Sequence, residues 1–329
     1  MLLLKKDDIK KVFTMRDAIE ADKEAFRIYC EGKSVNPLRT NIPVPSQDAS
    51  MLFMPGYIEE LGCGGIKIVS VFPKNAQKGK PVIPATVLLL DGETGEVSAA
   101  LDGTYVTQIR TGAASGAAID VLAKKDSKIG ALIGLGGQGE PQLEAMIEAR
   151  DLDEVRVFSR NKESREKFAE EMNLKLSKYN TKIIAVESSD EAIDNADVIV
   201  LATPSKQPVL NGNLVKKGAL ISAVGSYMPD MQELCPNCLT RASKIFFEST
   251  DAVLCESGDI LIPLEEGKIS KDDFNGDLGN VINGTIPGRE SDDEIIVFKT
   301  VGIGVQDVVT AKRIYDKAKE NGIGMDWKW

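Results

Sequence analysis

The clearest candidate for a ligand-binding motif in the sequence is a set of three spaced glycines that follows a short apolar run. The run, Ile129–Ile133, has the length of a buried strand, and the stretch after the glycines, Glu140–Arg150, has a helical pattern. Only glycine lets a backbone turn this tightly and approach a pyrophosphate, while the start of the helix offers N–H groups to the phosphates. The G-x-G-x-x-G spacing therefore predicts a dinucleotide-binding loop, although a glycine-rich turn in another α/β unit has the same pattern. The residues of this loop are Gly134, Gly136, Gly137, Gln138 and Gly139.

The residues after the next predicted strand, Glu154–Phe158, indicate which dinucleotide would bind. In NAD-binding units, an acid about 20 residues past the glycines bonds the ribose hydroxyls. Here the strand is followed by Ser159, Arg160 and Asn161, so that position holds no acid. A hydroxyl followed by two cations within four residues, Arg160 and Lys162, suits a 2′-phosphate. The sequence therefore favours NADPH over NADH, with a solvated Arg160 and bound NADH as the alternative.

The ends of two later predicted strands are expected close to the same loop. Thr203 and Pro204 lie at the end of Val198–Thr203, and Val224 lies near the end of Leu220–Gly225. In open α/β sheets, ligands bind beyond the carboxyl ends of the strands. We therefore expect Thr203, Pro204 and Val224 to border the dinucleotide.

Strands alternate with helices from residue 127 onward, and this alternation predicts an α/β fold with a doubly wound parallel sheet. The remaining strands are expected at Lys182–Val186 and Lys244–Phe247, and residues 295–304 are expected to form a final strand and turn. Further helices are expected at Lys162–Asn173 and Ser189–Asn195.

Residues 1–122 show a different organisation. Helical spacing covers 7–31, with Thr14 placed to cap a second helix. Strand-like segments follow at 50–54, 64–71 and 82–91, and a short turn then leads into a further strand at 97–101 as a hairpin. The pattern predicts an α+β segment with an antiparallel sheet.

Two more helices are expected to connect the first segment with the parallel sheet and to return the chain to the first segment. Thr104–Leu122 is rich in small residues and leads into the glycine stretch, while Asp307–Asn321 is amphipathic and is expected to pack back on the first segment. We therefore place one domain at 1–122 together with 305–329 and a dinucleotide-binding domain at 123–304.

Composition narrows the classes of function. The chain of 329 residues has a net charge of −10 and no basic block, which argues against a nucleic-acid partner. Its apolar runs are far shorter than the ~20 residues that a membrane span needs. There is no histidine, so the commonest general base and a leading metal ligand are missing, and we expect no metal site.

Five cysteines, an odd number in a long chain, favour a reducing cytoplasm over a disulfide framework. Cys235 and Cys238 form a C-x-x-C pair. Such a pair can be half a zinc site or a redox pair, but with no second C-x-x-C and no histidine, two ordinary cysteines are the simpler interpretation.

Four stretches outside the loop resemble the ornithine cyclodeaminase/mu-crystallin family. They are Leu-Arg-Thr at 38–40, Gly-Ile-Lys at 65–67 with Val-Phe-Pro-Lys-Asn at 71–75, Leu-Asp-Gly-Thr to Arg-Thr-Gly-Ala at 101–113, and Ala-Val-Gly-Ser-Tyr-Met-Pro-Asp at 223–230. The resemblance implies a Rossmann domain between two parts of a substrate domain, a homodimer formed by the substrate domains, and hydride exchange with a small imino or amino acid.

The resemblance also assigns roles to residues. It implies that Arg39 and Arg110 hold the substrate carboxylate, for which two guanidinium groups are well suited. It matches Lys67 to the family's active-site lysine, and it places Thr111 among the cofactor-binding residues. A lysine within an apolar strand is costly to bury without a partner, so Lys67 either carries a function or reaches solvent at a sheet edge.

One departure from the family pattern bears on the reaction. The cyclodeaminases and the alanine dehydrogenase of the family have an aspartate where this chain has Tyr227. Deamination of a free amino acid uses that carboxylate more than reduction of a preformed cyclic imine does. The sequence thus favours reduction of Δ1-pyrroline-2-carboxylate or Δ1-piperideine-2-carboxylate to proline or pipecolate. Ornithine cyclodeamination, amino-acid dehydrogenation and ligand binding without turnover are the alternatives.

Overall fold

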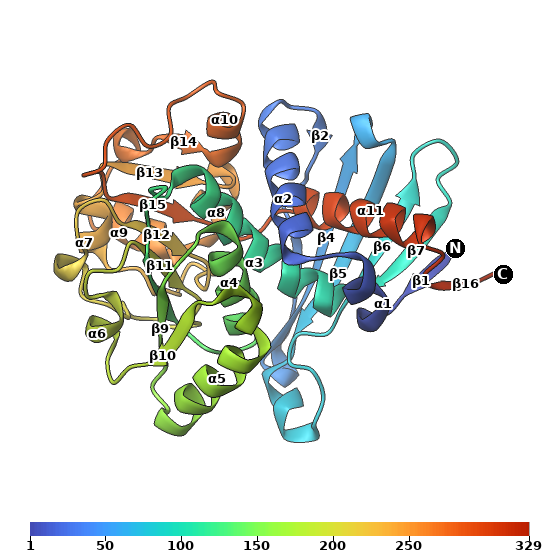
Figure 1. Ribbon diagram of the computed structural model, residues 1–329. Helices are drawn as coiled ribbons and strands as arrows, with labels where there is room; N and C mark the ends of the chain where they lie inside the picture. Colours follow the sequence, from blue (N-terminus) through green and yellow to red (C-terminus); the bar gives the residue numbers. More distant parts are fainter. Residues whose placement is uncertain (329) are drawn as a thin grey trace. The chain divides into compact units, whose positions relative to one another are not determined.

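The computed structural model describes residues 1–328 and divides into two compact units (Figure 1). Unit 1 consists of Met1–Arg110 and the chain from Ile303 onward, and unit 2 consists of Thr111–Gly302. The boundary falls inside one helix, α3 (Gly103–Leu122), between Arg110 and Thr111. The dinucleotide-loop residues and the family's carboxylate-binding residues therefore belong to different units.

Unit 1 is built on a sheet with the strand order β16-β1-β7-β6-β5-β4-β2, and β3 pairs separately with β4. Its pairs are antiparallel except for β1 with β7. The strands are β1 (Leu2–Leu4), β2 (Ser34–Val35), β3 (Thr40–Val44), β4 (Ala49–Ile58), β5 (Cys63–Val71), β6 (Ala85–Asp91), β7 (Val97–Asp102) and β16 (Met325–Asp326). The predicted hairpin of β6 and β7 is confirmed, whereas the pairing of the two chain ends through β1 and β16 was not foreseen.

Besides the first part of α3, the helices of unit 1 are α1 (Lys6–Val12), α2 (Met15–Cys30) and α11 (Gly304–Glu320). Thr14 caps α2 as predicted, because its hydroxyl oxygen accepts a hydrogen bond from the Asp17 N–H at 3.2 Å. Helix α11 packs on α2, β4 and β5, which confirms that the last helix returns to the first segment.

Glycines in the sheet let α11 approach it closely. A Cβ on Gly56 would lie 3.3 Å from the Val308 side chain, and one on Gly65 would lie 3.1 Å from it. Because both positions lack a side chain, the first turn of α11 rests directly on β4 and β5. This approach brings the residue before Val308 within reach of the β5 side chains.

Unit 2 is an α/β fold with a parallel, doubly wound sheet, as predicted. The strand order is β10-β9-β8-β11-β12-β15-β13-β14, and every pair is parallel. The order reverses between β8 and β11, which is the place where such sheets bind ligands. The strands are β8 (Ile129–Ile133), β9 (Glu154–Phe158), β10 (Lys182–Ala185), β11 (Val198–Leu201), β12 (Leu220–Ala223), β13 (Lys244–Phe247), β14 (Gly276–Asp277) and β15 (Ile296–Lys299).

Helices connect these strands, and the loop-to-helix unit after β8 follows the prediction closely. The helices of unit 2, besides its part of α3, are α4 (Gly139–Ala149), α5 (Lys162–Lys175), α6 (Ser189–Ile193), α7 (Pro236–Thr240), α8 (Thr250–Glu256), α9 (Gly258–Glu265) and α10 (Leu278–Ile282). Helix α9 and the insertion of β15 between β12 and β13 were not predicted. Short 3₁₀ helices lie at Pro45–Gln47, Glu59–Leu61, Pro73–Lys78, Ser177–Tyr179, Gly212–Leu214 and Lys271–Asp273.

The small residues of α3 allow tight packing within unit 2. Gly112 lies against the backbone of Pro141 at the start of α4, where a Cβ would collide. The Ser115 and Ser222 hydroxyls are 2.8 Å apart in the core. Within the part of the chain that the structure describes, no helix has both the length and the apolar character to cross a membrane.

Candidate functional site

Lys67 lies near the middle of β5 and is almost fully buried, at 1% exposure. Alternate residues of this strand, including Gly65 and Val69, face the covered side of the sheet, and Lys67 shares their side. Its Nζ lies 2.7 Å from Oδ2 of Asp307. Asp307 therefore provides the anionic partner that a buried lysine requires. The alternative interpretation, in which Lys67 reaches solvent at a sheet edge, is wrong.

Asp307 joins Lys67 to Arg110. It lies in the first turn of α11, directly before Val308, and has no exposed surface. Its Oδ1 accepts a hydrogen bond from Nε of Arg110 at 3.1 Å, and Arg110 is itself only 6% exposed. Asp307 was not predicted as a site residue, because an acidic residue in the first turn of a helix is common and indicates only where the helix starts. The signal was indirect: a lysine buried in β5 requires a buried anion from another element.

Electrostatics within this cluster set the state of the Lys67 ammonium group. The pKa of Lys67 is lowered to about 7, because burial and then the positive charge of Arg110 lower it more than the attraction of Asp307 raises it. Arg39, half-buried before β3, also lowers this pKa, so its charge reaches Lys67. Unit 1 thus brings Lys67 and Arg110 onto the single carboxylate of Asp307, with the charge of Arg39 acting on Lys67.

This arrangement can do two things chemically. Three basic groups outnumber one carboxylate, so the cluster has a surplus of positive charge that suits a carboxylate ligand. A lysine with a pKa near neutrality can also give or take a proton under ordinary conditions.

The glycine loop has the geometry that a pyrophosphate needs. Gly134 follows β8 with a φ of 106°, and a Cβ there would collide with the carbonyl oxygen of Ala202 at the end of β11. Gly136 and Gly137 are exposed, and a Cβ on either would have no neighbour within 4 Å among the described residues. The space over this backbone is therefore open. Gln138 is the N-cap residue of α4 and makes no side-chain capping bond there.

Thr111 lies beside the start of α4. Its carbonyl oxygen accepts a hydrogen bond from Nε2 of Gln142, in the first turns of α4, at 2.9 Å. This contact and the close approach of Gly112 to Pro141 hold α3 against the loop-to-helix unit. Thr111, Gln138 and the exposed glycines therefore belong to one region of unit 2.

Ser159, Arg160 and Asn161 form the turn between β9 and α5. The Asn161 side chain caps α5 by accepting a hydrogen bond from the Ser164 N–H at 2.8 Å. Ser159 Oγ donates to the Asn161 carbonyl oxygen at 3.4 Å, and Arg160 is exposed. Asn161 therefore shapes the turn through its side-chain oxygen, whereas the Arg160 guanidinium faces solvent.

Glu233, which was not predicted as a site residue either, links the ends of β11 and β12. Its Oε2 accepts hydrogen bonds from the Thr203 N–H at 2.7 Å and the Thr203 hydroxyl at 2.9 Å. Its Oε1 accepts from the N–H groups of Val224 at 3.1 Å and Gly225 at 2.5 Å. Thr203 and Val224 are thereby brought together, as predicted, with exposed Pro204 beside them. No local pattern distinguished Glu233 from the polar residues around it.

The Glu233 carboxyl group is fully buried, and its surroundings raise its pKa. Burial, followed by the nearby charge of Asp259, raises the pKa of Glu233 to about 7. Oδ1 of Asp259 accepts hydrogen bonds from the Glu233 and Leu234 N–H groups at 2.7 and 2.8 Å, and Lys299 pairs with Asp259 at 3.0 Å. This network fixes the segment that carries Glu233.

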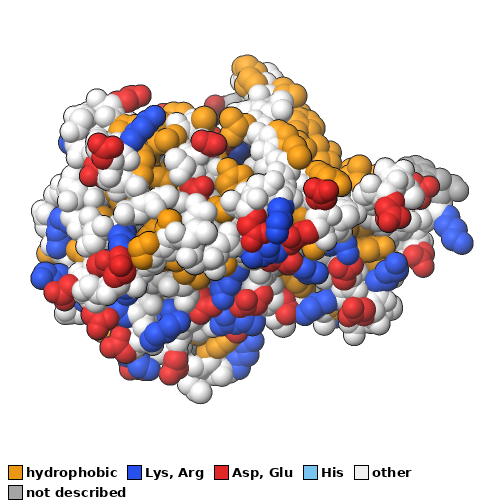
Figure 2. Space-filling model, turned by 90° about the horizontal axis from the view of Figure 1, so that it is seen from above, with side chains coloured by type: hydrophobic (Ala, Val, Ile, Leu, Met, Phe, Trp, Pro, Cys, Tyr) orange, Lys and Arg blue, Asp and Glu red, His pale blue; other side chains and the backbone are white. Residues whose placement is uncertain are grey.

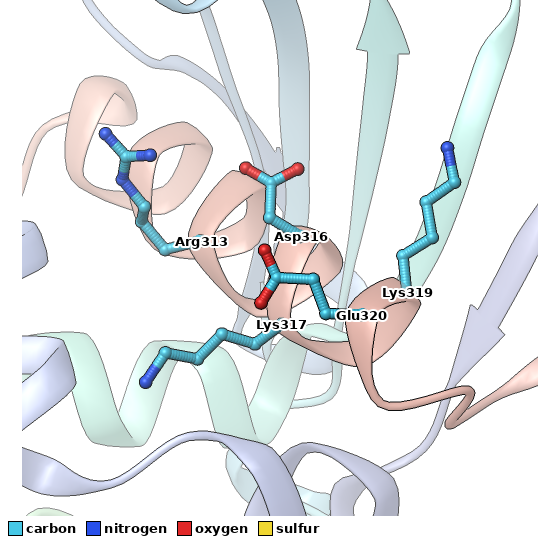
Figure 3. A pocket seen from close by; sticks show the side chains of 5 residues that line it. All are labelled: Arg313, Asp316, Lys317, Lys319 and Glu320. Carbon is cyan, nitrogen blue, oxygen red and sulfur yellow. The ribbon is translucent and has the colours of Figure 1, made fainter.

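A surface pocket of unit 1 lies along α11, away from the buried cluster (Figure 3). Charged residues line it, and several are already paired, such as Lys317 with Asp17 at 2.7 Å and Asp316 with Lys312 at 2.6 Å. Paired, solvated charges of this kind contribute little and indicate no particular ligand. The lining residues are Arg313, Asp316, Lys317, Lys319 and Glu320.

The fold defines a two-unit α/β protein with a Rossmann-type sheet in unit 2. Residues 1–322 match the model of the ornithine cyclodeaminase/mu-crystallin family. The chain belongs to this family, as the resemblance of its motifs predicted.

Relatives and solved structures match over nearly the whole chain. A Delta(1)-pyrroline-2-carboxylate reductase from Bacillus cereus is 38% identical over 324 residues, which cover 98% of either sequence. The solved Delta(1)-pyrroline-2-carboxylate reductase of Thermococcus litoralis, in complex with NADH and L-proline, has 39% identity and a TM-score of 0.94, covering 99% of this chain and 100% of that one. An archaeal alanine dehydrogenase dimer with bound NAD has 33% identity and a TM-score of 0.91, covering 100% and 99%.

Proposed function

We propose that this protein reduces a cyclic imine carboxylate, Δ1-pyrroline-2-carboxylate or its six-membered homologue Δ1-piperideine-2-carboxylate, to proline or pipecolate. The observation that carries the proposal is the buried cluster of Lys67, Asp307 and Arg110, with the charge of Arg39 reaching it. The relatives named as Delta(1)-pyrroline-2-carboxylate reductases, one of them solved with L-proline, support the same substrate class.

The cluster supports two roles in such a reaction. Arg39 and Arg110 hold the substrate carboxylate; Arg110 meets Asp307 through Nε, which leaves its terminal nitrogens for a carboxylate. Lys67 supplies a proton to the imine nitrogen, directly or through a water, because a protonated imine accepts hydride more readily. Asp307 keeps Lys67 charged enough to act as that donor.

Unit 2 is proposed to hold the nicotinamide dinucleotide, which supplies the hydride for C2 of the imine when it is bound. The open backbone at Gly136 and Gly137 suits the pyrophosphate, and the uncapped start of α4 lies next to it. Ser159 and the exposed guanidinium of Arg160 suit a 2′-phosphate, so we propose NADPH as the preferred donor and NADH as a second one. The solved relatives contain NADH and NAD.

Gln138 and Gly139 at the start of α4, with Thr111 of α3 beside them, complete the proposed dinucleotide site on the loop side. Thr203, Pro204 and Val224 complete it at the strand ends that Glu233 holds. Gly134 sets the turn, and Asn161 shapes the loop that presents Ser159 and Arg160.

We also propose that unit 1 forms a homodimer through the outer face of its sheet. Ile42 is paired with Met51 across β3 and β4, and Phe53 with Ile68 across β4 and β5. On this face Ile42 is 47% exposed, Met51 37% and Ile68 37%, whereas the opposite face is covered by α11. Hydrophobic side chains gather on one part of the surface in Figure 2. Exposed apolar faces of this kind mark contacts between subunits, and a related alanine dehydrogenase is described as a dimer.

Cofactor oxidation on a small panel of substrates tests the reaction. With NADPH and then NADH, we expect rapid reduction of both cyclic imines, since one methylene in an apolar pocket is worth only ~1–3 kcal/mol. Ammonia release from ornithine, or reduction of pyruvate with ammonia, should be slow. Ornithine turnover faster than imine reduction, or no oxidation with any imine, would overturn the proposal.

A further inference from the structure

Cys235 and Cys238 lie at the start of α7 in unit 2, one helical turn apart. Cys235 is the N-cap residue and Pro236 is the first residue of the helix. The Cys238 N–H donates to the Cys235 carbonyl oxygen at 2.8 Å, which closes the turn between them. Both cysteines are free, and the Cys238 thiol is near enough to the Cys235 sulfur to shift the pKa of Cys235.

The surroundings of the two thiols differ. Cys235 is half-buried and Cys238 is only 1% exposed, so a small molecule can reach the first sulfur but not the second. Gly212 packs on Cys238, and a Cβ there would lie 3.0 Å from the Cys238 sulfur. The absent side chain at Gly212 therefore keeps the pair close to the backbone of the Gly212–Leu214 turn.

The neighbouring Cys238 thiol, followed by the backbone N–H groups of Gly212, Asn237 and Cys238, lowers the pKa of Cys235 to about 5 against the opposing effect of burial. The same contact and burial raise the pKa of Cys238 well above its usual range. One cysteine is thus held as the thiolate and the other as the thiol.

We propose that Cys235 and Cys238 form a redox-active dithiol that reacts with low-molecular-weight disulfides. The Cys235 thiolate attacks one sulfur of the small disulfide, whose S–S bond breaks and releases a thiolate that takes up a proton. The Cys238 thiol then gives up its proton and attacks the Cys235 sulfur, which forms the Sγ–Sγ bond and expels the second small thiol. Two cysteine thiols are oxidised and one small disulfide is reduced to two thiols.

Glutathione redox buffers and mass spectrometry of the full chain test this site. After reaction with oxidised glutathione, we expect the wild-type protein to lose two hydrogen atoms, with the new bond mapped to the peptide that contains both cysteines. Cys238→Ser should stop at a mixed disulfide on Cys235, and Cys235→Ser should form neither product. Cys255→Ser, which removes an exposed cysteine elsewhere, should behave as wild type.

A second measurement needs no variant. In the reduced wild-type protein near neutral pH, we expect iodoacetamide to label Cys235 about tenfold or more faster than exposed Cys255, because only the thiolate reacts. Labelling of Cys255 first, or a wild-type protein that takes up glutathione without closing the Cys235–Cys238 bond, would overturn the proposal. Neither experiment depends on imine reduction, so the outcome is independent of the function proposed above.

Discussion

The ammonium nitrogen of Lys67 lies 2.7 Å from Oδ2 of Asp307, and both side chains are buried although they come from distant parts of the chain. Removing two charges from water is costly, and well-packed apolar residues often serve stability as well as a buried ion pair does. The pair is therefore better explained by what it does to a ligand and a proton than by stability alone.

Asp307→Asn tests the pair directly. We expect kcat/KM for imine reduction to fall by about 100-fold or more. Lys67 would lose the negative charge of Asp307 that keeps it protonated, and Arg110 would lose the carboxylate that accepts its hydrogen bond. The free energy of unfolding should fall by about 3 kcal/mol, since the change leaves buried cations without an anion. Asp316→Asn, on the exposed side of the same helix, is the matched control. A variant with normal kcat/KM and reduced stability would limit Asp307 to a structural role.

The pKa of Lys67 predicts the pH dependence of turnover. Because burial lowers that pKa to about 7, Lys67 holds its proton below this pH and loses it above. If the protonated form acts as the acid, kcat/KM for imine reduction should decline as the pH rises through about 7. Lys67→Ala should lose most turnover but still bind the dinucleotide, as measured by fluorescence titration. Wild-type turnover in this variant would exclude Lys67 as the donor.

Arg160→Ala tests the choice of dinucleotide. The exposed guanidinium should matter only for a ligand with a 2′-phosphate, so we expect KM for NADPH to rise about tenfold while KM for NADH stays nearly constant. Lys167→Ala, at an exposed position farther along α5, provides a control for the loss of a positive charge. Equal changes for both dinucleotides would contradict the assignment.

Glu233→Gln tests the link between the ends of β11 and β12. The glutamine side chain has the same shape as glutamate, but its NH2 group replaces one acceptor oxygen. That NH2 group would face the N–H of Thr203 or the N–H groups of Val224 and Gly225, which need an acceptor. We expect the dinucleotide Kd to rise about tenfold or more, with a loss of about 1–3 kcal/mol in stability. Asp230→Asn, on the exposed surface nearby, should leave both unchanged. An unaltered Kd would show that Glu233 does not shape the dinucleotide site.

Ile68→Asp tests the proposed homodimer. A charge on the outer face of β5 should prevent burial of that face, so sedimentation should show monomers where the wild-type protein gives dimers. Leu174→Asp, at a highly exposed position of α5, is the control and should not change the assembly. A dimer that persists in Ile68→Asp would place the interface elsewhere.

Local patterns were enough to predict much of the fold. The glycine spacing located the β8-to-α4 turn, and the Thr14 cap located the start of α2. The insertion of β15 between β12 and β13 could not be predicted, because strand order depends on long-range packing that leaves no periodic signal.

The same limit applies to the candidate site. Arg39, Lys67 and Arg110 could be selected because motifs surround them, whereas Asp307 and Glu233 act through partners that are remote in sequence. A buried lysine implies that an anion exists but not which one. Likewise, the N–H groups at the end of a strand need an acceptor, and nothing local identifies Glu233 as that acceptor.

Asp307 also has a consequence for the order in which the protein is made. Thr111–Gly302 is one continuous stretch, so unit 2 can fold while the ribosome is still synthesising the chain. Lys67 is synthesised early, yet its counter-ion and the helix that covers its strand come only with α11. The first unit therefore stays incomplete, with the side of the sheet that holds Lys67 open to water, until α11 has left the ribosome.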